Sequence, residues 1–166
     1  MGIVIHVHNG AQVRTIDFMR GDLVTESHNG SVYAGHPLAE VSQAAMNVWA
    51  AQHGFAMKPE AHVTTAASRK PVDLRRIQRL AGGMIVPPGG RTIEQFGDHI
   101  VMCLACDELQ RRHDEYKKAG ASWDFPTYRP HITLGRAVYL PPVADITPFD
   151  EPLTLGPEAV ASFDDY

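Results

Sequence analysis

Two tripeptides with one pattern carry the residue types of this chain that are best suited to chemistry: His62-Val-Thr64 and His131-Ile-Thr133. Each lies in a short stretch rich in β-branched residues between turn signals, which predicts a strand. Side chains alternate between the two faces of a strand, so the His and Thr of each copy share one face. Two such faces turned towards each other would place two imidazoles and two hydroxyls around one cleft. That arrangement suits acid–base chemistry on a phosphodiester.

The doubling gives this His-x-Thr motif its weight. With nine His and nine Thr in the chain, a single His-x-Thr triplet arises by chance often enough to mean little. Two copies, both in a strand context and in different halves of the chain, are harder to attribute to chance. The alternative stays open that each His is a satisfied polar residue on a strand and each Thr a good strand former.

Composition bounds the class of protein. At 166 residues, with 44% hydrophobic and 20% charged residues, we expect one soluble globular domain. No apolar run approaches the length of a membrane span and no basic-then-apolar leader opens the chain, so we expect no membrane partner and a cytoplasmic location. Two cysteines favour a reducing compartment. The net charge of −4 argues against binding polymeric nucleic acid but permits a small anionic ligand.

The first 30 residues predict an N-terminal hairpin extension. Residues 3–8 and 13–18 read as strands around Asn9-Gly10, a preferred pair for a tight hairpin turn. His6 and His8 share a strand face and could be read as a metal pair. No Asp/Glu-rich cluster accompanies them, so a surface strand face is favoured and no metal site is predicted.

The remaining elements follow from turn signals and hydrophobic periodicity. In the first half we expect a short strand at 31–34 that includes Tyr33 and ends at Gly35-His-Pro, and a helix at 37–52 capped by Gly54. The apolar stripe of that helix is predicted to comprise Leu38, Val41, Ala45, Val48 and Trp49. In the second half we expect a short helix at 73–80, a loop at 82–90, strands at 91–96 and 99–104 joined by Gly97-Asp98, a helix at 107–119 capped by Gly120, a strand at 131–139, and strands at 152–155 and 159–163.

Three further features of the sequence could form sites. Cys103-Leu-Ala-Cys106 resembles a redox pair, but acidic residues at the start of the following helix would raise a thiol pKa, so a redox role is disfavoured. Arg69 and Lys70 follow the first motif strand, where an anion would lie, although a solvated loop is an alternative. The loop at 82–90 lacks the pattern of a phosphate cradle, so no nucleoside triphosphate cofactor is implied.

Several stretches together resemble a known family. The paired motifs are similar to those of the 2H phosphoesterase superfamily, and more narrowly the chain resembles the phage anti-CBASS cyclic-oligonucleotide phosphodiesterases, including versions in phage portal polypeptides. The resemblance covers roughly residues 31–160 and leaves the N-terminal hairpin outside. The similar stretches are Val32-Tyr33, Trp49–Phe55, His62–Thr64 with Pro71–Asp73, Glu108–His113, Gly120–Thr133 and Leu155–Glu158.

The resemblance implies a two-lobed α+β fold, with a central cleft between antiparallel sheets and helices outside. It implies metal-independent, cofactor-free opening of cyclic dinucleotide or trinucleotide messengers of bacterial anti-phage signalling, inside an infected host. The catalytic residues that the resemblance implies are His62, Thr64, His131 and Thr133. The substrate-binding residues implied are Tyr33, packed against a base, and Glu158, in contact with one.

Two aromatic residues are candidates on general grounds. Trp123 and Tyr128 lie in the stretch before the second motif, and aromatic faces stack on bases. Their alternative role is to pack the loop beneath the site. Three functions therefore remain open: a cyclic-oligonucleotide phosphodiesterase, another 2H activity such as an RNA-end cyclic phosphodiesterase or ligase-like enzyme, and a non-catalytic nucleotide binder or portal accessory domain.

Overall fold

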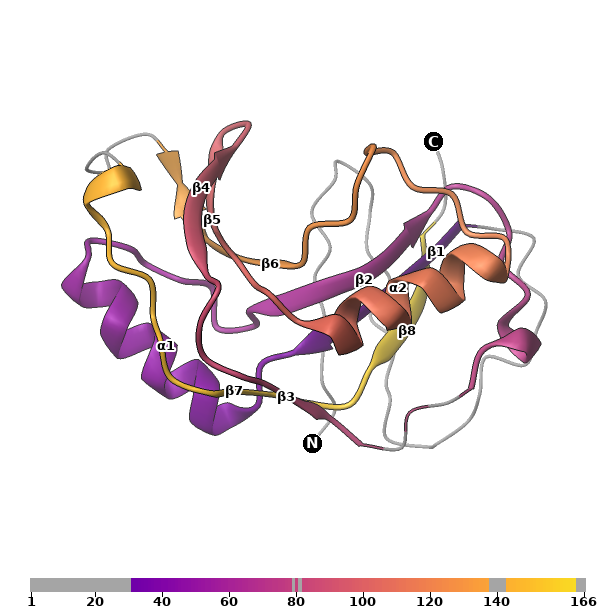
Figure 1. Ribbon diagram of the computed structural model, residues 1–166, viewed down its shortest axis with the longest axis horizontal. Coiled ribbons are helices and arrows are strands. Elements are labelled where there is room, and N and C mark those ends of the chain that lie inside the picture. The colour runs from indigo at the N-terminus through magenta and orange to yellow at the C-terminus, as the bar shows by residue number, and fades with distance from the viewer. Residues whose placement is uncertain (1–30, 79, 81, 138–142, 164–166) are drawn as a thin grey trace.

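The computed structural model describes residues 31–78, 80, 82–137 and 143–163, which form a mixed α+β fold (Figure 1). This described part contains two α-helices and eight strands, and all the strand pairs are antiparallel. The predicted α+β class is confirmed. The N-terminal hairpin predicted at residues 3–18, with His6 and His8, lies outside the described residues.

The first sheet contains the first motif at its edge. Its order is β2-β1-β8, with bounds β1 Ser31–Pro37, β2 His62–Ser68 and β8 Ala159–Phe163. The prediction that β1 ends at Gly35 is wrong, because β1 runs on to Pro37, which pairs with His62. Glycine and proline end isolated strands, but here β2 and β8 supply partners on both sides as far as Gly35.

The second sheet contains the second motif at its edge. Its order is β4-β5-β6, with bounds β4 Thr92–Phe96, β5 His99–Cys103 and β6 His131–Arg136. The β4–β5 hairpin was predicted, and Gly97 at φ +60° supplies the left-handed turn conformation that glycine adopts readily. The second motif strand ends at Arg136, so the predicted extension to 139 is too long within the described residues.

A two-stranded sheet joins distant parts of the chain. It pairs β3 Met84–Val86 with β7 Leu153–Leu155, which was predicted as a strand. The prediction of a loop at 82–90 is therefore wrong at Met84–Val86, which form β3. Three residues among glycines and prolines give too little local signal, and the partner that makes them a strand lies about seventy residues away in the sequence.

Helix α1 Glu40–Gln52 buries a face that matches the prediction in part: Leu38, Ala45 and Trp49 lie in or against the core as predicted, but Val41 and Val48 do not. It begins after Ala39 rather than at Pro37, and Gly54 at φ +82° follows it as expected. The buried residues are Ser42, Met46 and Ala50, whereas Val41 and Val48 are 71% and 62% exposed. The predicted stripe followed the β-branched residues, but small and flexible side chains face the core. Trp49 was predicted in the core and packs against it half-buried.

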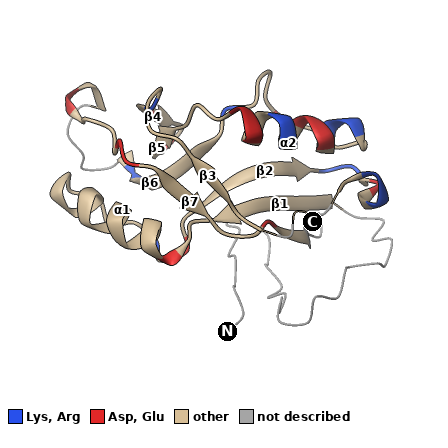
Figure 2. Ribbon diagram, turned by 60° about the horizontal axis from the view of Figure 1, so that its bottom comes forward, with Lys and Arg blue, Asp and Glu red and all other residues tan. Residues whose placement is uncertain are grey.

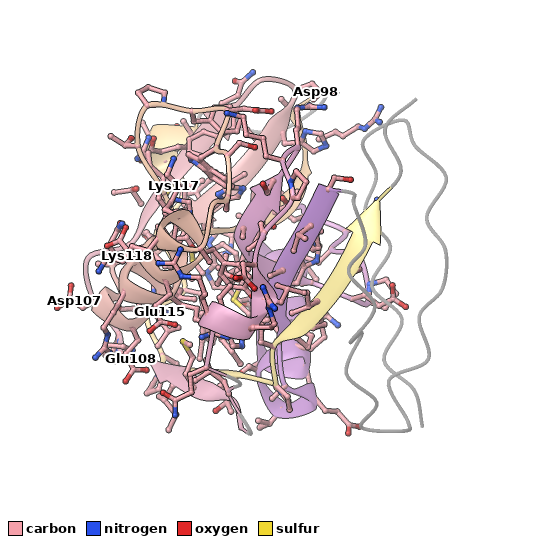
Figure 3. The ribbon with its side chains drawn as sticks, turned by 90° about the vertical axis from the view of Figure 1, so that its right-hand side faces the viewer. Asp98, Asp107, Glu108, Glu115, Lys117 and Lys118 are labelled. Carbon is pink, nitrogen blue, oxygen red and sulfur yellow. The ribbon has the colours of Figure 1, made fainter. Side chains whose placement is uncertain are left out.

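Helix α2 Asp107–Lys118 lies against β2 and keeps its charged side chains outside except for that of Arg112, which is buried. Red and blue alternate along its outer side in Figure 2, and Figure 3 shows Asp107 and Lys118 at the surface. Gly120 at φ +107° follows its end as predicted. Before α2, the helix predicted at 73–80 is only a single turn, Leu74–Arg76.

The apolar residues between the motif His and Thr enter one core. Val63 and Ile132 are both 0% exposed and belong to the same cluster as Met46, Met102 and Leu153. That cluster spans both three-stranded sheets, α1 and β7. The core therefore fixes the two motif strands relative to each other.

Candidate active site

The two motif strands lie beside each other, each at the edge of its own sheet. β2 and β6 are in contact but belong to different sheets, so they form no hydrogen-bonded ladder. His62, Thr64 and His131 are half-buried and Thr133 is exposed, whereas the intervening apolar residues are fully buried. The predicted alternation is confirmed: the His and Thr of each strand face away from the core.

Each motif strand has a β-bulge at the same place, one residue after the threonine. The register of β1 with β2 shifts so that Thr65 is the extra residue, and the register of β5 with β6 shifts so that Leu134 is the extra residue. A bulge bends a strand and re-aims the side chains next to it. The doubling seen in the sequence therefore extends to the backbone around Thr64 and Thr133.

The two imidazoles are held in the same way. Nδ1 of His62 bonds to the carbonyl of Glu60 at 3.1 Å, and Nδ1 of His131 bonds to the carbonyl of Arg129 at 2.8 Å. A carbonyl only accepts, so Nδ1 carries the hydrogen in both rings. The neutral rings then present an unprotonated Nε2 as the nitrogen available for a substrate.

Burial and charge repulsion favour the neutral forms. Burial is the main cause that lowers the pKa of His62, and the positive charge of a protonated His131 lowers it further. Burial is also the main cause that lowers the pKa of His131, with the Arg129 charge adding to it. Burial therefore favours the neutral form of both rings, and a charge on His131 further opposes a charge on His62.

An aromatic ring packs edge-on against each imidazole. Tyr33 meets His62 at a centroid distance of 6.1 Å and 80°, and Phe96 meets His131 at 5.1 Å and 72°. The Tyr33 hydroxyl lies 2.6 Å from Thr64 Oγ1, and burial raises the pKa of Tyr33 to about 12. Tyr33 is 5% exposed, so its hydroxyl supports the motif threonine, and packing of a base on its ring stays a prediction.

Glu158 is the centre of a buried network rather than an open ligand. Its carboxylate accepts two hydrogen bonds from Arg112, at 2.9 and 2.7 Å, and one from Tyr116 at 2.6 Å. Thr65 donates to it at 3.4 Å, and the side chain is 4% exposed. The carboxylate thus links α2 to the bulge of β2, and its predicted contact with a base remains untested.

Trp123 and Tyr128 gather around His113 of α2. The Tyr128 and His113 rings stack at 4.1 Å and 3°, and Trp123 meets His113 edge-on at 4.8 Å. The Tyr128 hydroxyl donates to the carbonyl of Thr64 at 2.8 Å. These contacts match the packing role weighed for the two residues, and stacking on a base stays a prediction for both.

A hollow of about 340 Å³ adjoins the second motif. It is bounded by the ends of β4 and β5, the start of α2 and the segment Tyr128–Pro130. Cys103 lines it and pairs with His131 across β5 and β6, so their side chains share one sheet face. The hollow therefore lies on the same face of the second sheet as the His131 side chain, lined by the segment that leads into the second motif.

The remaining candidate features, the basic segment after β2, the cysteines and the metal pair, form no site among the described residues. Arg69 bonds to Asp124 at 3.0 Å in an exposed position just past β2, and both cysteines are free thiols. No three His, Cys, Asp or Glu side chains gather to hold a metal ion within the described residues. His6 and His8 lie outside them, so their metal alternative stays untested. No helix in the described part is long and apolar enough to cross a membrane.

Sequence reasoning missed Phe96, His113 and Arg112 as neighbours of the site. His113 and Arg112 lie in a charged helix that reads as fully exposed, although both are buried against β2 and the Glu158 carboxylate. Helical spacing alone gives a signal, since Leu109, Arg112, His113 and Tyr116 form the buried face. Phe96 ends a hairpin strand and carried no signal of its contact with His131.

The fold and the paired motifs define the class: an α+β protein in which two antiparallel sheets bring together two edge strands, each with a His-x-Thr motif. The family described as "Anti-CBASS protein Acb1" matches residues 30–166. The chain therefore belongs to the Acb1 anti-CBASS family.

Three relatives, each named "Anti-CBASS protein Acb1", agree with this assignment. The chain is 36% identical over 127 residues to the one from Caulobacter sp. (strain RHG1), which covers 70% of this chain and 20% of the relative. It is 31% identical to that of Sphingomonas paeninsulae, over 76% of this chain and 22% of the relative. It is 36% identical to that of Escherichia phage RB16, over 57% of this chain and 53% of the relative. The chain thus matches about a fifth of the length of the two bacterial relatives.

Proposed function

We propose that this domain is a phosphodiesterase of the 2H type that opens cyclic dinucleotide or trinucleotide messengers inside an infected bacterial host. The observation that carries the proposal is the matched pair of imidazoles. His62 and His131 are each held through Nδ1 by the carbonyl two residues earlier, and the charge on one affects the other. Membership of an anti-CBASS family supports a cyclic-oligonucleotide signal as the substrate.

The proposed step is an internal transfer of the phosphoryl group. A neutral Nε2 takes the proton from a ribose 2′-hydroxyl, whose oxygen attacks the adjacent phosphorus. The bond from phosphorus to the 5′-oxygen breaks. The other histidine, which is protonated at the start of the step, gives its Nε2 proton to that oxygen. The ring opens to a linear product with a 2′,3′-cyclic phosphate. The two motifs are too alike to assign which His is the base.

The threonines stabilise the charge that builds up on phosphorus. Thr64 and Thr133 would donate hydrogen bonds to the non-bridging oxygens. The raised pKa of Tyr33 keeps its hydroxyl protonated, so it can donate to Thr64 Oγ1. That contact leaves the Thr64 hydrogen for the substrate. The hollow lined by Tyr128–Pro130 would offer room for a further part of the nucleotide.

The test is incubation with a panel of cyclic dinucleotides and trinucleotides in EDTA, followed by chromatography and mass spectrometry. The expected product has the mass of the ring but a different retention, and it gains the mass of one water when its cyclic phosphate is hydrolysed. Turnover of RNA ends alone would favour another 2H activity. Binding of the ring without turnover would favour a sequestering protein. Either result contradicts the proposal.

A further inference from the structure

We propose that His113 and Tyr128 are positioning residues that hold the bulge of β2 and thereby aim the Thr64 hydroxyl. The two rings donate to consecutive carbonyls at that bulge. The Tyr128 hydroxyl donates to the carbonyl of Thr64 at 2.8 Å, and His113 Nδ1 donates to the carbonyl of Thr65 at 2.8 Å. As a catalytic role for Thr64 belongs to the proposed function, the inference rests on that function.

The bulge needs donors from outside its sheet. A bulge interrupts the regular ladder, and buried backbone carbonyls are almost always paired with some donor. Thr65 itself is fully buried, so water cannot serve this purpose well at its carbonyl. The hydroxyl of Thr65 is also engaged, by Glu158 at 3.4 Å. Without the two rings, the backbone that carries Thr64 would have alternative arrangements.

The two donors act as one unit. Their rings are stacked at 4.1 Å and 3°, and Trp123 closes the stack edge-on, at 4.8 Å from His113 and 5.7 Å from Tyr128. Tyr128 lies three residues before His131. The segment that enters the second motif therefore holds the backbone of the first motif, and the two halves of the site are joined by this clamp of His113 and Tyr128.

The protonation states of the clamp suit donation. A carbonyl cannot donate, so Nδ1 of His113 carries the hydrogen. Burial lowers the pKa of His113, which keeps the ring neutral, and burial raises the pKa of Tyr128 well above its usual range, which keeps its hydroxyl protonated. Neither ring bonds to Thr64 Oγ1 among the described contacts, so the clamp acts through the backbone.

Variants that keep the rings and remove the donors test the clamp. Tyr128→Phe and His113→Phe preserve the stack, whereas His113→Asn restores a donor near the position of Nδ1. We expect each Phe variant to lower kcat about tenfold with KM within about twofold, because the misaimed hydroxyl weakens transition-state contacts more than binding. His113→Asn should recover most of that loss. Equal activity of His113→Asn and His113→Phe would overturn the inference.

The matched control is Ser42→Ala. Ser42 Oγ is also buried and accepts from the backbone nitrogen of Thr154 at 2.7 Å, but it lies in α1. We expect this variant to lose thermal stability as the Phe variants do while keeping kcat. A similar fall in kcat for Ser42→Ala would mean that the clamp residues act only through overall stability.

A second readout does not depend on turnover. Amide hydrogen exchange at residues 64–66, measured by NMR, should rise at least about fivefold more in Tyr128→Phe than in Ser42→Ala, since the clamp raises the local opening free energy. If the wild-type protein cuts no cyclic nucleotide, the proposed function fails, and the exchange rates still decide whether the clamp holds the bulge. Unchanged exchange at the bulge would overturn the inference.

Discussion

The lowered pKa of each motif histidine determines how the rate should depend on pH. The pKa of His62 and the pKa of His131 both lie below the ordinary value of 6.5, chiefly because the two rings are buried. The protonated acid is lost as pH rises through its lowered pKa, so kcat/KM should follow a bell with its maximum below about pH 6.5. A bound phosphate stabilises the imidazolium, which should move the kcat profile to higher pH. Initial rates between about pH 4 and 9 test this, and a kcat/KM that still rises above pH 8 contradicts it.

The same two side chains should be indispensable. If they act as base and acid, His62→Ala and His131→Ala should each lower kcat at least about a hundredfold without unfolding the protein. His53→Ala is the matched control, because its Nδ1 also bonds to a carbonyl, that of Trp49 at 2.8 Å, at the end of α1. Circular dichroism and turnover should be measured for all three. Near-normal turnover in either motif variant would refute the two-histidine mechanism.

The nucleophile can be tested on the substrate rather than the protein. A cyclic dinucleotide built from 2′-deoxyriboses keeps its bases, phosphates and ring size, and each lost hydroxyl contact should cost only about 1 kcal/mol of binding. It should not be cut, because the attacking oxygen is missing. We therefore expect a competitive inhibitor that is not a substrate. Cleavage of the deoxy ring at a rate near that of the ribo ring would mean attack by water.

At the scale of elements, local signals predicted what local contacts form. The β4–β5 hairpin and α2 were read from turn pairs, periodicity and end glycines, and each closes on residues nearby in the sequence. The continuation of β1 past Gly35, the strand β3 and part of the buried face of α1 depend on distant partners. No local pattern carries that information, so these were missed.

In the candidate site too, local patterns predicted some features, and others depend on distant parts of the chain. Spacing and alternation placed His62, Thr64, His131 and Thr133 on the faces of two strands that are turned away from the core, because a strand fixes that alternation by itself. The paired bulges were beyond the sequence, since a bulge is defined by the register with another strand. The contacts that hold the bulge of β2 come from α2 and the segment before β6.

Gly35 should be the most sensitive backbone position beside the first bulge. It pairs with Thr64, and a Cβ there would lie 3.0 Å from the Val63 carbonyl and 3.4 Å from the Tyr33 hydroxyl. Gly35→Ala should therefore lower the free energy of unfolding by about 1–2 kcal/mol and reduce kcat by disturbing Tyr33 and Thr64.

Gly135 provides the matched control for Gly35. It pairs next to the second bulge, but a Cβ there would meet only Phe55, at an ordinary 3.7 Å. Gly135→Ala should be neutral or slightly stabilising, by up to about 1 kcal/mol, because alanine restricts the unfolded chain more than glycine does. Urea denaturation and turnover distinguish the pair. Equal effects of the two substitutions would contradict the steric argument.

At the scale of the whole molecule, one buried carboxylate joins elements from both ends of the described chain. Glu158 precedes β8 and contacts Arg112 and Tyr116 of α2, Thr65 of β2 and, at 3.4 Å, the buried His36 of β1. Removing one partner of a buried ion pair is costly because the other charge stays in the interior. The network therefore couples the docking of α2 to the sheet that carries the first motif.

The Glu158 carboxylate should make the free energy of unfolding depend on pH in the acid range. Burial alone would raise the pKa of Glu158, but hydrogen bonds from Arg112 and Tyr116, together with the His36 imidazole 3.4 Å away, lower it from 4.5 to about 2. Because the folded pKa lies below the unfolded one, the carboxylate stabilises the fold fully above pH 4.5, and this contribution is lost as pH falls from 4.5 towards 2. A lowering of this size corresponds to about 3 kcal/mol.

Glu158→Gln isolates that contribution. At pH 7 the amide removes the buried carboxylate partner of Arg112 and leaves only the half-exposed Glu115, so the free energy of unfolding should fall by about 3 kcal/mol. Urea denaturation at several pH values between about 3 and 7 should show the difference from wild type shrinking below pH 4.5, where the wild-type carboxylate begins to be protonated. Glu108→Gln is the control, since Glu108 is 56% exposed and 3.8 Å from Arg111, and such surface pairs contribute little. A difference between wild type and Glu158→Gln that stays constant across this range would show that a group other than Glu158 causes the loss of stability in acid.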